Sequence, residues 1–155
     1  MGRFAWIKMN GKNNKQVLIM SAYRVCKAGT NIGPHTAHMQ QVNYLLKKGI
    51  TNPNPRQAIL RDMQAIIKEH QNRGGGVIVM MDANEDWEKD AGGEIAEFLL
   101  ESQLEDMHKV RQQPIPKTTY TRGSKRLDYT PSGQKCTYDR AKIANKSYAY
   151  FWHFF

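Results

Sequence analysis

Acidic residues are absent from the first part of the chain. Residues 1–61 contain ten lysines and arginines but no aspartate or glutamate. Residues 62–108 reverse this balance, with twelve acidic residues against three basic ones, and residues 109–155 contain ten basic residues against two acidic ones. This order argues against a charge that serves general solubility alone. The net charge of +9 favours a polyanionic partner such as DNA or RNA.

Cysteines and long apolar runs are scarce as well. The two cysteines, Cys26 and Cys136, are too few for a disulfide framework, and their spacing excludes a cysteine metal site. We interpret both as free thiols in a reducing, intracellular environment. The sequence does not identify the compartment, and the nucleus is one candidate. No signal peptide and no apolar run near about 18 residues is present, so neither secretion nor a membrane partner is expected.

A run of strand length without polar alternation, Gly76–Met81, ends in Asp82 and Asn84. Such a run is typical of a strand buried on both faces, in a parallel or mixed sheet with helices on either side. Ligands of such sheets bind at the carboxyl ends of the strands. If the chain is still extended there, the spacing lets Asp82 and Asn84 point into one crevice. Both residue types are also ordinary turn formers, so the pair alone does not define a site.

Two other regions are predicted to form hairpins. Apolar runs over 4–9 and 17–23 are joined by Asn10-Gly11, which is a strong hairpin signal. A second hairpin is expected where 118–121 and 126–129 flank a basic turn. The last 25 residues show neither helical nor strand periodicity.

Three helices are predicted from the spacing of apolar residues. The clearest begins at Asn54 as N-cap, with Pro55 in its first turn, and ends before Gly74. Shorter helices are expected over 36–48 and 93–101. The apolar face of the clearest helix consists of Ile59, Met63, Ile66, Ile67 and His70.

Three short motifs occur in order along the chain: Ser21-Ala-Tyr23-Arg24, Met81-Asp82-Ala-Asn84 and Arg126-Leu-Asp128-Tyr129. Together they resemble the endonuclease/exonuclease/phosphatase superfamily, which includes pancreatic deoxyribonuclease, abasic-site endonucleases and the endonucleases of retroelements. The last motif has the family's form verbatim. The middle motif keeps the family's Asp-x-Asn pair but changes its neighbours.

The resemblance implies a fold and a set of roles. The implied fold is α/β, part of a two-sheet, helix-flanked four-layer sandwich with mixed strands. The implied cofactor is Mg²⁺ or Mn²⁺, and the metal ligands stay unknown. Asp82 would orient or deprotonate the attacking water, and Asn84 would support the scissile phosphate. Tyr23 would contact that phosphate through its hydroxyl, and Asp128 would hold a late catalytic histidine.

The chain departs from the family pattern at both ends. The family has a metal-binding glutamate before its tyrosine motif, but no carboxylate precedes Asp62 here. The family closes with Ser-Asp-His, whereas His153 lacks the preceding aspartate and is assigned no role. We therefore expect residues 1–129 to form a partial domain, and residues 130–155 to be a divergent C-terminal segment of a truncated or decayed copy.

Charged residues beside the motifs are candidates for binding. Glu85, Asp86, Glu88 and Asp90 could bind a cation beside Asp82, although an acidic loop in solvent fits equally well. Basic residues next to the motifs are expected to contact the phosphate backbone of a nucleic acid, although each taken singly is more often a surface charge. These basic residues are Arg24, Lys27, Arg122, Lys125 and Arg126.

The expected function is metal-dependent phosphodiester hydrolysis of DNA or RNA. We expect little or no cleavage by this chain, because the upstream glutamate and the late histidine are missing. One alternative is a non-catalytic nucleic-acid-binding remnant. Another is a phosphoesterase that acts on phosphorylated lipids or small molecules. The basic charge favours the two nucleic-acid hypotheses.

Overall fold

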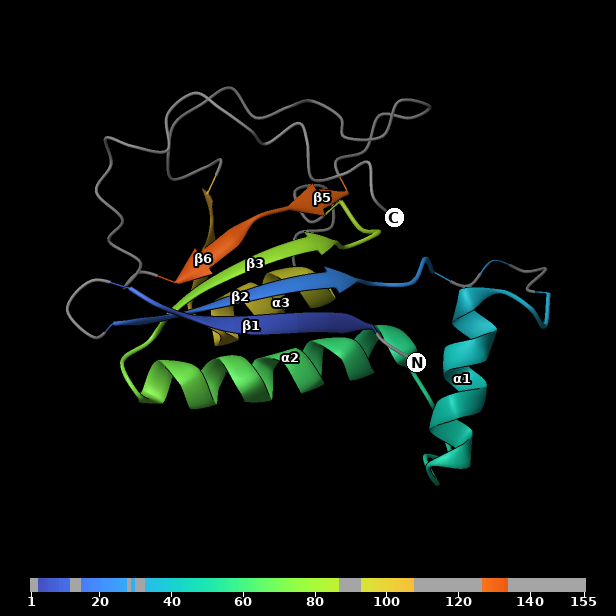
Figure 1. Cartoon of the computed structure of the whole chain (residues 1–155). Coiled ribbons are helices and arrows are strands. Elements are labelled where there is room, and N and C mark those ends of the chain that lie inside the picture. The colour runs from blue at the N-terminus through green and yellow to red at the C-terminus, as the bar shows by residue number, and fades with distance from the viewer. Residues whose placement is uncertain are drawn as a thin grey trace.

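The computed structural model describes residues 3–11, 15–27, 29, 33–86, 93–107 and 127–133. These residues form a mixed α/β structure with one mixed sheet of six strands and three helices. In chain order the elements are β1 (Phe4–Asn10), β2 (Gln16–Tyr23), α1 (Ala37–Lys47), α2 (Pro55–Asn72), β3 (Gly76–Asp82), α3 (Glu94–Glu101), β4 (Leu104–Asp106), β5 (Asp128–Tyr129) and β6 (Pro131–Gly133). Figure 1 shows α2 and α3 along the sheet and α1 standing at one end of it.

β3 lies in the middle of the sheet. The strand order is β1-β2-β3-β6-β4, and β5 also pairs with β3. β2 and β3 run parallel, whereas the other described pairs are antiparallel. A parallel pair requires a crossover connection, which α1 and α2 supply here. The predicted β1–β2 hairpin is confirmed, and at its closed end the Gly11 N–H donates to the Lys15 carbonyl oxygen at 2.7 Å.

One face of the sheet carries the core. Leu18 pairs with Val77 and Met20 pairs with Val79, and all four side chains are buried. Burying each such side chain stabilises the fold by about 1.5–3 kcal/mol relative to leaving it exposed. They pack against apolar side chains of α2 and α3, which confirms the predicted apolar face of α2. The helix residues in this cluster are Ile59, Leu60, Met63, Ile67, Ile95, Phe98 and Leu99.

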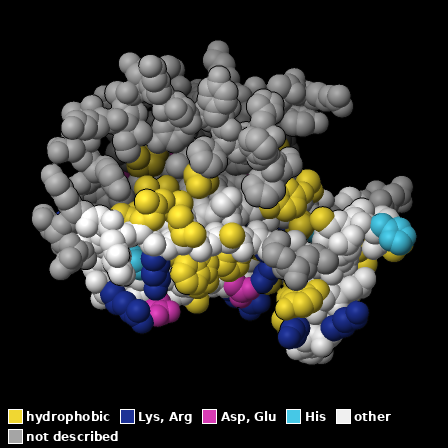
Figure 2. Space-filling view, viewed as in Figure 1, with side chains coloured by type: hydrophobic (Ala, Val, Ile, Leu, Met, Phe, Trp, Pro, Cys, Tyr) yellow, Lys and Arg dark blue, Asp and Glu magenta, His cyan; other side chains and the backbone are white. Residues whose placement is uncertain are grey.

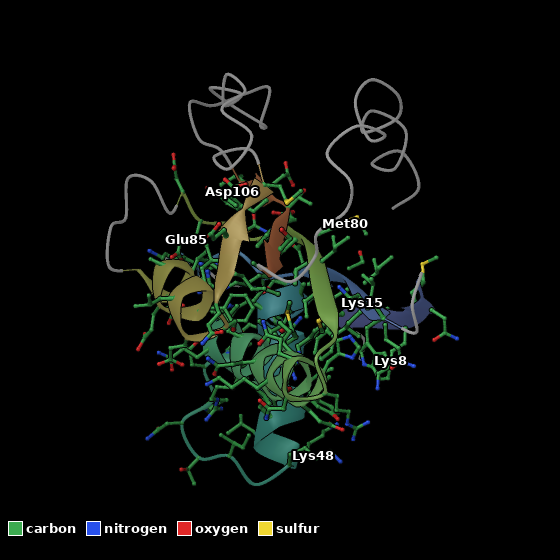
Figure 3. All side chains as sticks on the ribbon, turned by 90° about the vertical axis from the view of Figure 1, so that its left-hand side faces the viewer. Lys8, Lys15, Lys48, Met80, Glu85 and Asp106 are labelled. Atoms are coloured by element: carbon green, nitrogen blue, oxygen red, sulfur yellow. The ribbon has the colours of Figure 1, made fainter. Side chains whose placement is uncertain are left out.

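The opposite face of the sheet is only partly covered by the described residues. In Figure 3, Met80 lies on the side of β3 away from α2 and α3, and Ile78 and Met80 are half-buried. On β1, Ile7 and Met9 are 58% and 50% exposed, and Ile7 shares this face with its partner Ile19. Figure 2 shows hydrophobic side chains at the surface over the strands. Among the described residues β3 is therefore fully buried on one face and half-buried on the other, and the four-layer sandwich is not confirmed.

The two ends of α2 are set by side-chain chemistry. The Asn54 side-chain oxygen accepts hydrogen bonds from the backbone N–H groups of Arg56 and Gln57 at 3.1 and 3.2 Å, which confirms Asn54 as the N-cap. After the helix, the chain passes so close to the buried His70 that a Cβ atom on Gly75 would lie 2.1 Å from the imidazole Nε2. A larger residue at this position, between the end of α2 and the start of β3, would collide with the imidazole ring.

The remaining predicted elements have mixed outcomes. The helices expected over 36–48 and 93–101 are confirmed as α1 and α3, and 128–129 forms β5. The hairpin partner expected at 118–121 lies outside the described residues. The sheet continues past Tyr129 into β6, so the expected domain boundary falls inside the sheet. Among the described residues, no helix is long and apolar enough to cross a membrane.

Self-association should depend on the exposed apolar side chains of β1 on the sheet face opposite α2 and α3. The double variant Ile7→Thr/Met9→Thr should be more monomeric than the parent chain, because it removes two exposed apolar side chains and keeps strand-forming residues. The measurement is solution mass by light scattering over a concentration series. The control is Leu100→Gln, which removes an apolar side chain that is 80% exposed on α3. An equal effect of both variants would contradict a specific role for this face.

Candidate functional site

The structure brings three of the predicted site residues into one row. Tyr23 of β2 pairs with Asp82 of β3, and Asp82 pairs with Asp128 of β5. Residues that pair directly across strands project to the same face of a sheet, so the three side chains share a face. This is the face opposite α2 and α3, because the neighbouring Met81 and Tyr129 are buried in the core on the helix side. The row lies at the carboxyl ends of β2 and β3.

Asn84 is held beside this row by its own hydrogen bonds. Its backbone N–H donates to Asp82 Oδ1 at 3.2 Å, and its side-chain Nδ2 donates to the Arg24 carbonyl oxygen at 2.7 Å. The Cys26 thiol donates to Asn84 Oδ1 at 3.2 Å. Asn84 has φ of 47°, in the left-handed region that asparagine tolerates better than most residues. The condition of an extended backbone from Asp82 to Asn84 is therefore not met, because the chain turns after β3.

The electrostatics of the row favour protonated forms. Burial raises the pKa of Asp82, and the negative charge of Asp128 raises it further, while the hydrogen bonds from Asn84 partly oppose the shift. Burial also raises the pKa of the Tyr23 hydroxyl, with smaller effects from Cys26 and Asp82. Tyr23 therefore keeps its proton at neutral pH and can donate a hydrogen bond. The Asp82–Asp128 pair crowds two carboxylates together.

Arg24 does not face a ligand. Its side chain is fully buried and pairs with Glu85, with Nη1 and Oε2 2.7 Å apart, and with Glu94. It also donates to the Arg56 and Ala83 carbonyl oxygens at 3.3 and 3.4 Å. The expected phosphate contact of Arg24 is corrected accordingly, since a buried guanidinium with these partners cannot reach a nucleic acid. The partners of Arg24 come from the loop after β3 and from the starts of α2 and α3, and sequence spacing alone did not show this arrangement.

Glu85 is the centre of a buried ion cluster. Besides Arg24, its Oε2 accepts from Arg56 Nη2 at 2.7 Å, and its Oε1 accepts from the Ile95 N–H at 3.5 Å. Burial opposes its ionisation, but the hydrogen bond and charge of Arg24 and the hydrogen bond of Arg56 outweigh it and lower the pKa of Glu85. The cation-binding role considered for Glu85 is therefore wrong. Its carboxylate joins the loop after β3 to the starts of α2 and α3.

Sequence reasoning missed two members of this cluster, Arg56 and Glu94. The usable signal for Glu94 was its place at the start of a helix, where a carboxylate is favourable. Arg56 carried no comparable signal, because a basic residue in a first helical turn reads as a surface charge. Asp86 is buried in the structure.

The other predicted residues have a simpler status. Lys27 is exposed and follows β2 at the edge that carries the row, and its phosphate contact stays a prediction. The remaining candidates lie outside the described residues. They are Glu88, Asp90, Arg122, Lys125 and Arg126.

The carboxylate pair fits a divalent metal in part. Magnesium commonly takes one or two protein carboxylates and fills its other positions with water and phosphate oxygens. Asp82 and Asp128 meet this requirement, and a cation between them would offset their mutual repulsion, which adds to the effect of burial in raising the pKa of Asp82. Among the residues that the structure describes, no group of three or more histidine, cysteine, aspartate or glutamate side chains could hold a metal ion.

Comparison with known proteins gives similarity in overall fold. No protein-family model matches the chain, and no curated protein matches it. The chain is similar to beta toxin from Staphylococcus aureus, with 14% identity and a TM-score of 0.42, over 85% of this chain and 43% of that one. It is also similar to the human Nocturnin catalytic domain with bound sulfate anion, with 16% identity and a TM-score of 0.47, over 85% and 49%. The chain therefore spans about half the length of these structures, and TM-scores below 0.5 give no basis for a functional assignment.

Asp82→Asn should stabilise the metal-free protein at neutral pH. The folded-state pKa of Asp82 is raised, so its ionised form destabilises the fold above that pKa, and this cost vanishes below the unfolded-state value near about 3.9. We expect a rise in Tm on the order of 2–4 °C at pH 7 in EDTA, and a smaller rise at pH 5.

The control for this measurement is Asp62→Asn, which removes a carboxylate that pairs with Arg3 and is half-exposed. Its Tm should stay level or fall. A drop in Tm for Asp82→Asn at pH 7 would show that burial and the charge of Asp128 impose no net cost on the ionised carboxylate.

Glu85→Ala should destabilise the protein severely. The substitution leaves two buried guanidinium groups without their shared carboxylate, and breaking such a buried pair costs about 3–5 kcal/mol. Because the pKa of Glu85 is lowered in the fold, its contribution is present at neutral pH and declines as the pH falls through the acidic range. Urea unfolding at pH 7 measures the loss.

The matched control is Glu69→Ala. Glu69 pairs with Arg73 at 2.7 Å on the surface of α2, where both side chains are more than half exposed. Its removal should change stability by no more than about 0.5 kcal/mol. Similar losses in the two variants would refute the special role of the cluster.

Proposed function

We propose that this chain carries part of a phosphodiesterase site that acts on nucleic acid with the help of a divalent metal. The row of Tyr23, Asp82 and Asp128 across three strands carries the proposal. These residues come from three motifs far apart in the sequence. Their meeting in one row at the carboxyl ends of two parallel strands supports a common site, because ligands of such sheets bind at that edge.

Each residue has a role suited to its surroundings. Asp82 and Asp128 would hold the metal ion, which when bound supplies positive charge to the phosphate. Asp82 also orients the attacking water. The Tyr23 hydroxyl, which keeps its proton at neutral pH, donates a hydrogen bond to a phosphate oxygen. Asn84 fixes the turn after β3, because its amide is bonded to the loop that follows β2.

The charge of the chain supports nucleic acid as the substrate class. A net charge of +9 attracts a polyanion, and the exposed Lys27 lies at the same edge as the row. A phosphorylated lipid or small phosphoester would use the same row but gains less from a widely distributed positive charge.

A non-catalytic nucleic-acid-binding protein is the second candidate. The favouring observation is that the described residues supply two facing carboxylates but no third metal-ligating side chain beside them. Such a protein would keep the salt-dependent binding and lose the chemistry.

Nicking of supercoiled plasmid distinguishes the two functions. We expect slow nicking by the 155-residue chain that requires magnesium and falls below detection in Asp82→Asn and in Asp128→Asn. Slow rather than fast cleavage is expected because the described residues supply only two carboxylates for a metal ion. The control is Lys68→Ala, an exposed position on α2 away from the row, which should keep the parent rate.

Two results would count against hydrolysis. Nicking that persists in Asp82→Asn would assign the cleavage to another site or to a contaminant. Absence of nicking, with oligonucleotide binding intact and weakened by salt, would favour the non-catalytic candidate.

A further inference from the structure

α1 projects from the body of the protein. Figure 1 shows the helix standing at the end of α2, clear of the sheet. It packs against α2, and among its eleven residues only Gln41 and Leu45 are buried. Eleven helical residues span about 16 Å, so the helix presents a long outward surface.

This surface combines lysines with large apolar side chains. Tyr44 and Leu46 are 42% and 48% exposed, and Ile50 just beyond the helix is 37% exposed. Lys47 lies in the last turn and Lys48 is the C-cap, and the Lys48 Nζ lies 5.8 Å from the centre of the Tyr44 ring. Figure 2 shows lysine or arginine side chains gathered at the free end of this helix, and Figure 3 shows Lys48 far from the sheet. An aromatic ring and two cations therefore share one exposed helix end.

α1 stands at the sheet edge that carries the candidate site. The chain enters α1 after β2 has ended at Tyr23, and it leaves α1 to begin α2. The start of α2 lies beside the end of β2, because Arg56 Nη1 donates to the Val25 carbonyl oxygen at 2.5 Å. Figure 1 shows α1 beyond the carboxyl ends of β2 and β3. A polymer bound at the row of Tyr23 would reach α1 by continuing past the end of β2, and Lys48 lies at the far end of that helix.

The positive charge of α1 and its neighbouring segments favours a polyanionic partner. No acidic residue precedes Asp62, so α1 and the segments on both sides of it carry positive charge only. Phosphates attract lysines, and bases stack on aromatic rings. An anionic membrane would also attract lysines and apolar side chains, but it would not bring a phosphodiester strand to the adjacent row.

We propose that α1 is an arm that binds the nucleic-acid strand leading away from the candidate site. Lys47 and Lys48 contact phosphates, and the Tyr44 ring, which lies beside Lys48, stacks on a base. At about 3.4 Å per nucleotide, the length of the helix corresponds to roughly five nucleotides of strand. The inference rests on the proposed function for the position of the strand, but it concerns binding and not hydrolysis.

The test is the binding of labelled single-stranded and duplex oligonucleotides of about 20 nucleotides to the full chain in EDTA, between about 50 and 200 mM salt. Lys47→Ala/Lys48→Ala should lower affinity about tenfold and reduce the slope of log affinity against log salt by about 1.5–2. Tyr44→Ala should weaken single-strand binding more than duplex binding, because stacking needs unpaired bases.

The matched control is Lys15→Ala/Lys68→Ala. It removes the same charge from two exposed positions, one just before β2 and one near the end of α2, both toward the opposite edge of the sheet. This variant should keep most of the parent affinity and salt slope. Circular dichroism should show the same helix content in both double variants, since all four lysines are exposed.

Three results would overturn the inference. Equal losses in the two double variants would show that net charge alone drives binding. Unchanged affinity in Lys47→Ala/Lys48→Ala would show that α1 does not touch the strand. Loss of binding to phosphatidylserine vesicles with unchanged oligonucleotide affinity would assign α1 to a membrane surface. A failure of the proposed function can be told apart from these results. If the parent chain does not nick plasmid but Lys47→Ala/Lys48→Ala still binds oligonucleotides more weakly, hydrolysis is refuted and the binding role of α1 stands.

Discussion

The buried arginine–glutamate cluster is the interaction on which the candidate site depends. Arg24 directly follows Tyr23, and Glu85 comes three residues after Asp82, so the cluster ties together the two strand ends that carry the row. Removing these ions from water costs several kcal/mol each, and only mutual pairing and backbone hydrogen bonds offset that cost. Because Arg56 joins the same carboxylate, the loops after β2 and β3 are fixed to the start of a long helix. The buried side chains of Arg24, Arg56 and Glu85 therefore fix the positions of the strand ends that carry the row, although they do not line its surface.

The row itself works against stability. Asp82 and Asp128 face each other as like charges, and Asn84 holds a left-handed backbone conformation. Unfavourable local features of this kind persist only where the surrounding structure holds them in place, and they are frequent at functional sites. The strand ends therefore carry opposite charges that pair on one side and like charges that repel on the other. The pairing on the first side offsets the repulsion on the second. The opposite charges hold the strand ends in place, and the like charges belong to the site that we propose.

Periodic features of the sequence predicted the fold well, and single charged residues predicted poorly. Asn54 and Pro55 marked the start of α2 because capping is a local interaction between neighbours in the chain. The order of the three motifs led us to assign Tyr23, Asp82 and Asp128 to one site. Their spacing in the sequence could not show that they pair directly across three strands. Arg24 was assigned to a ligand because burial depends on which segments cover a side chain, and that is decided by contacts distant in sequence. The sequence did not show what covers the second face of the sheet for a related reason, since an apolar run indicates that a strand avoids water without indicating which segments cover it.

The parallel pairing of β2 and β3 has a consequence for how the protein folds. Arg24 and Ala83, which bond across this pair, are 59 positions apart in the chain, with two helices between them. The β1–β2 hairpin needs only near neighbours and can form in microseconds, whereas closing a long crossover loses chain entropy before any contact rewards it. During synthesis the hairpin can therefore form while β3 is still inside the ribosome, and the edge of β2 then offers unpaired backbone groups to any other strand nearby. The time that each new chain is open to mispairing therefore depends on how fast α2 forms and β3 pairs with β2.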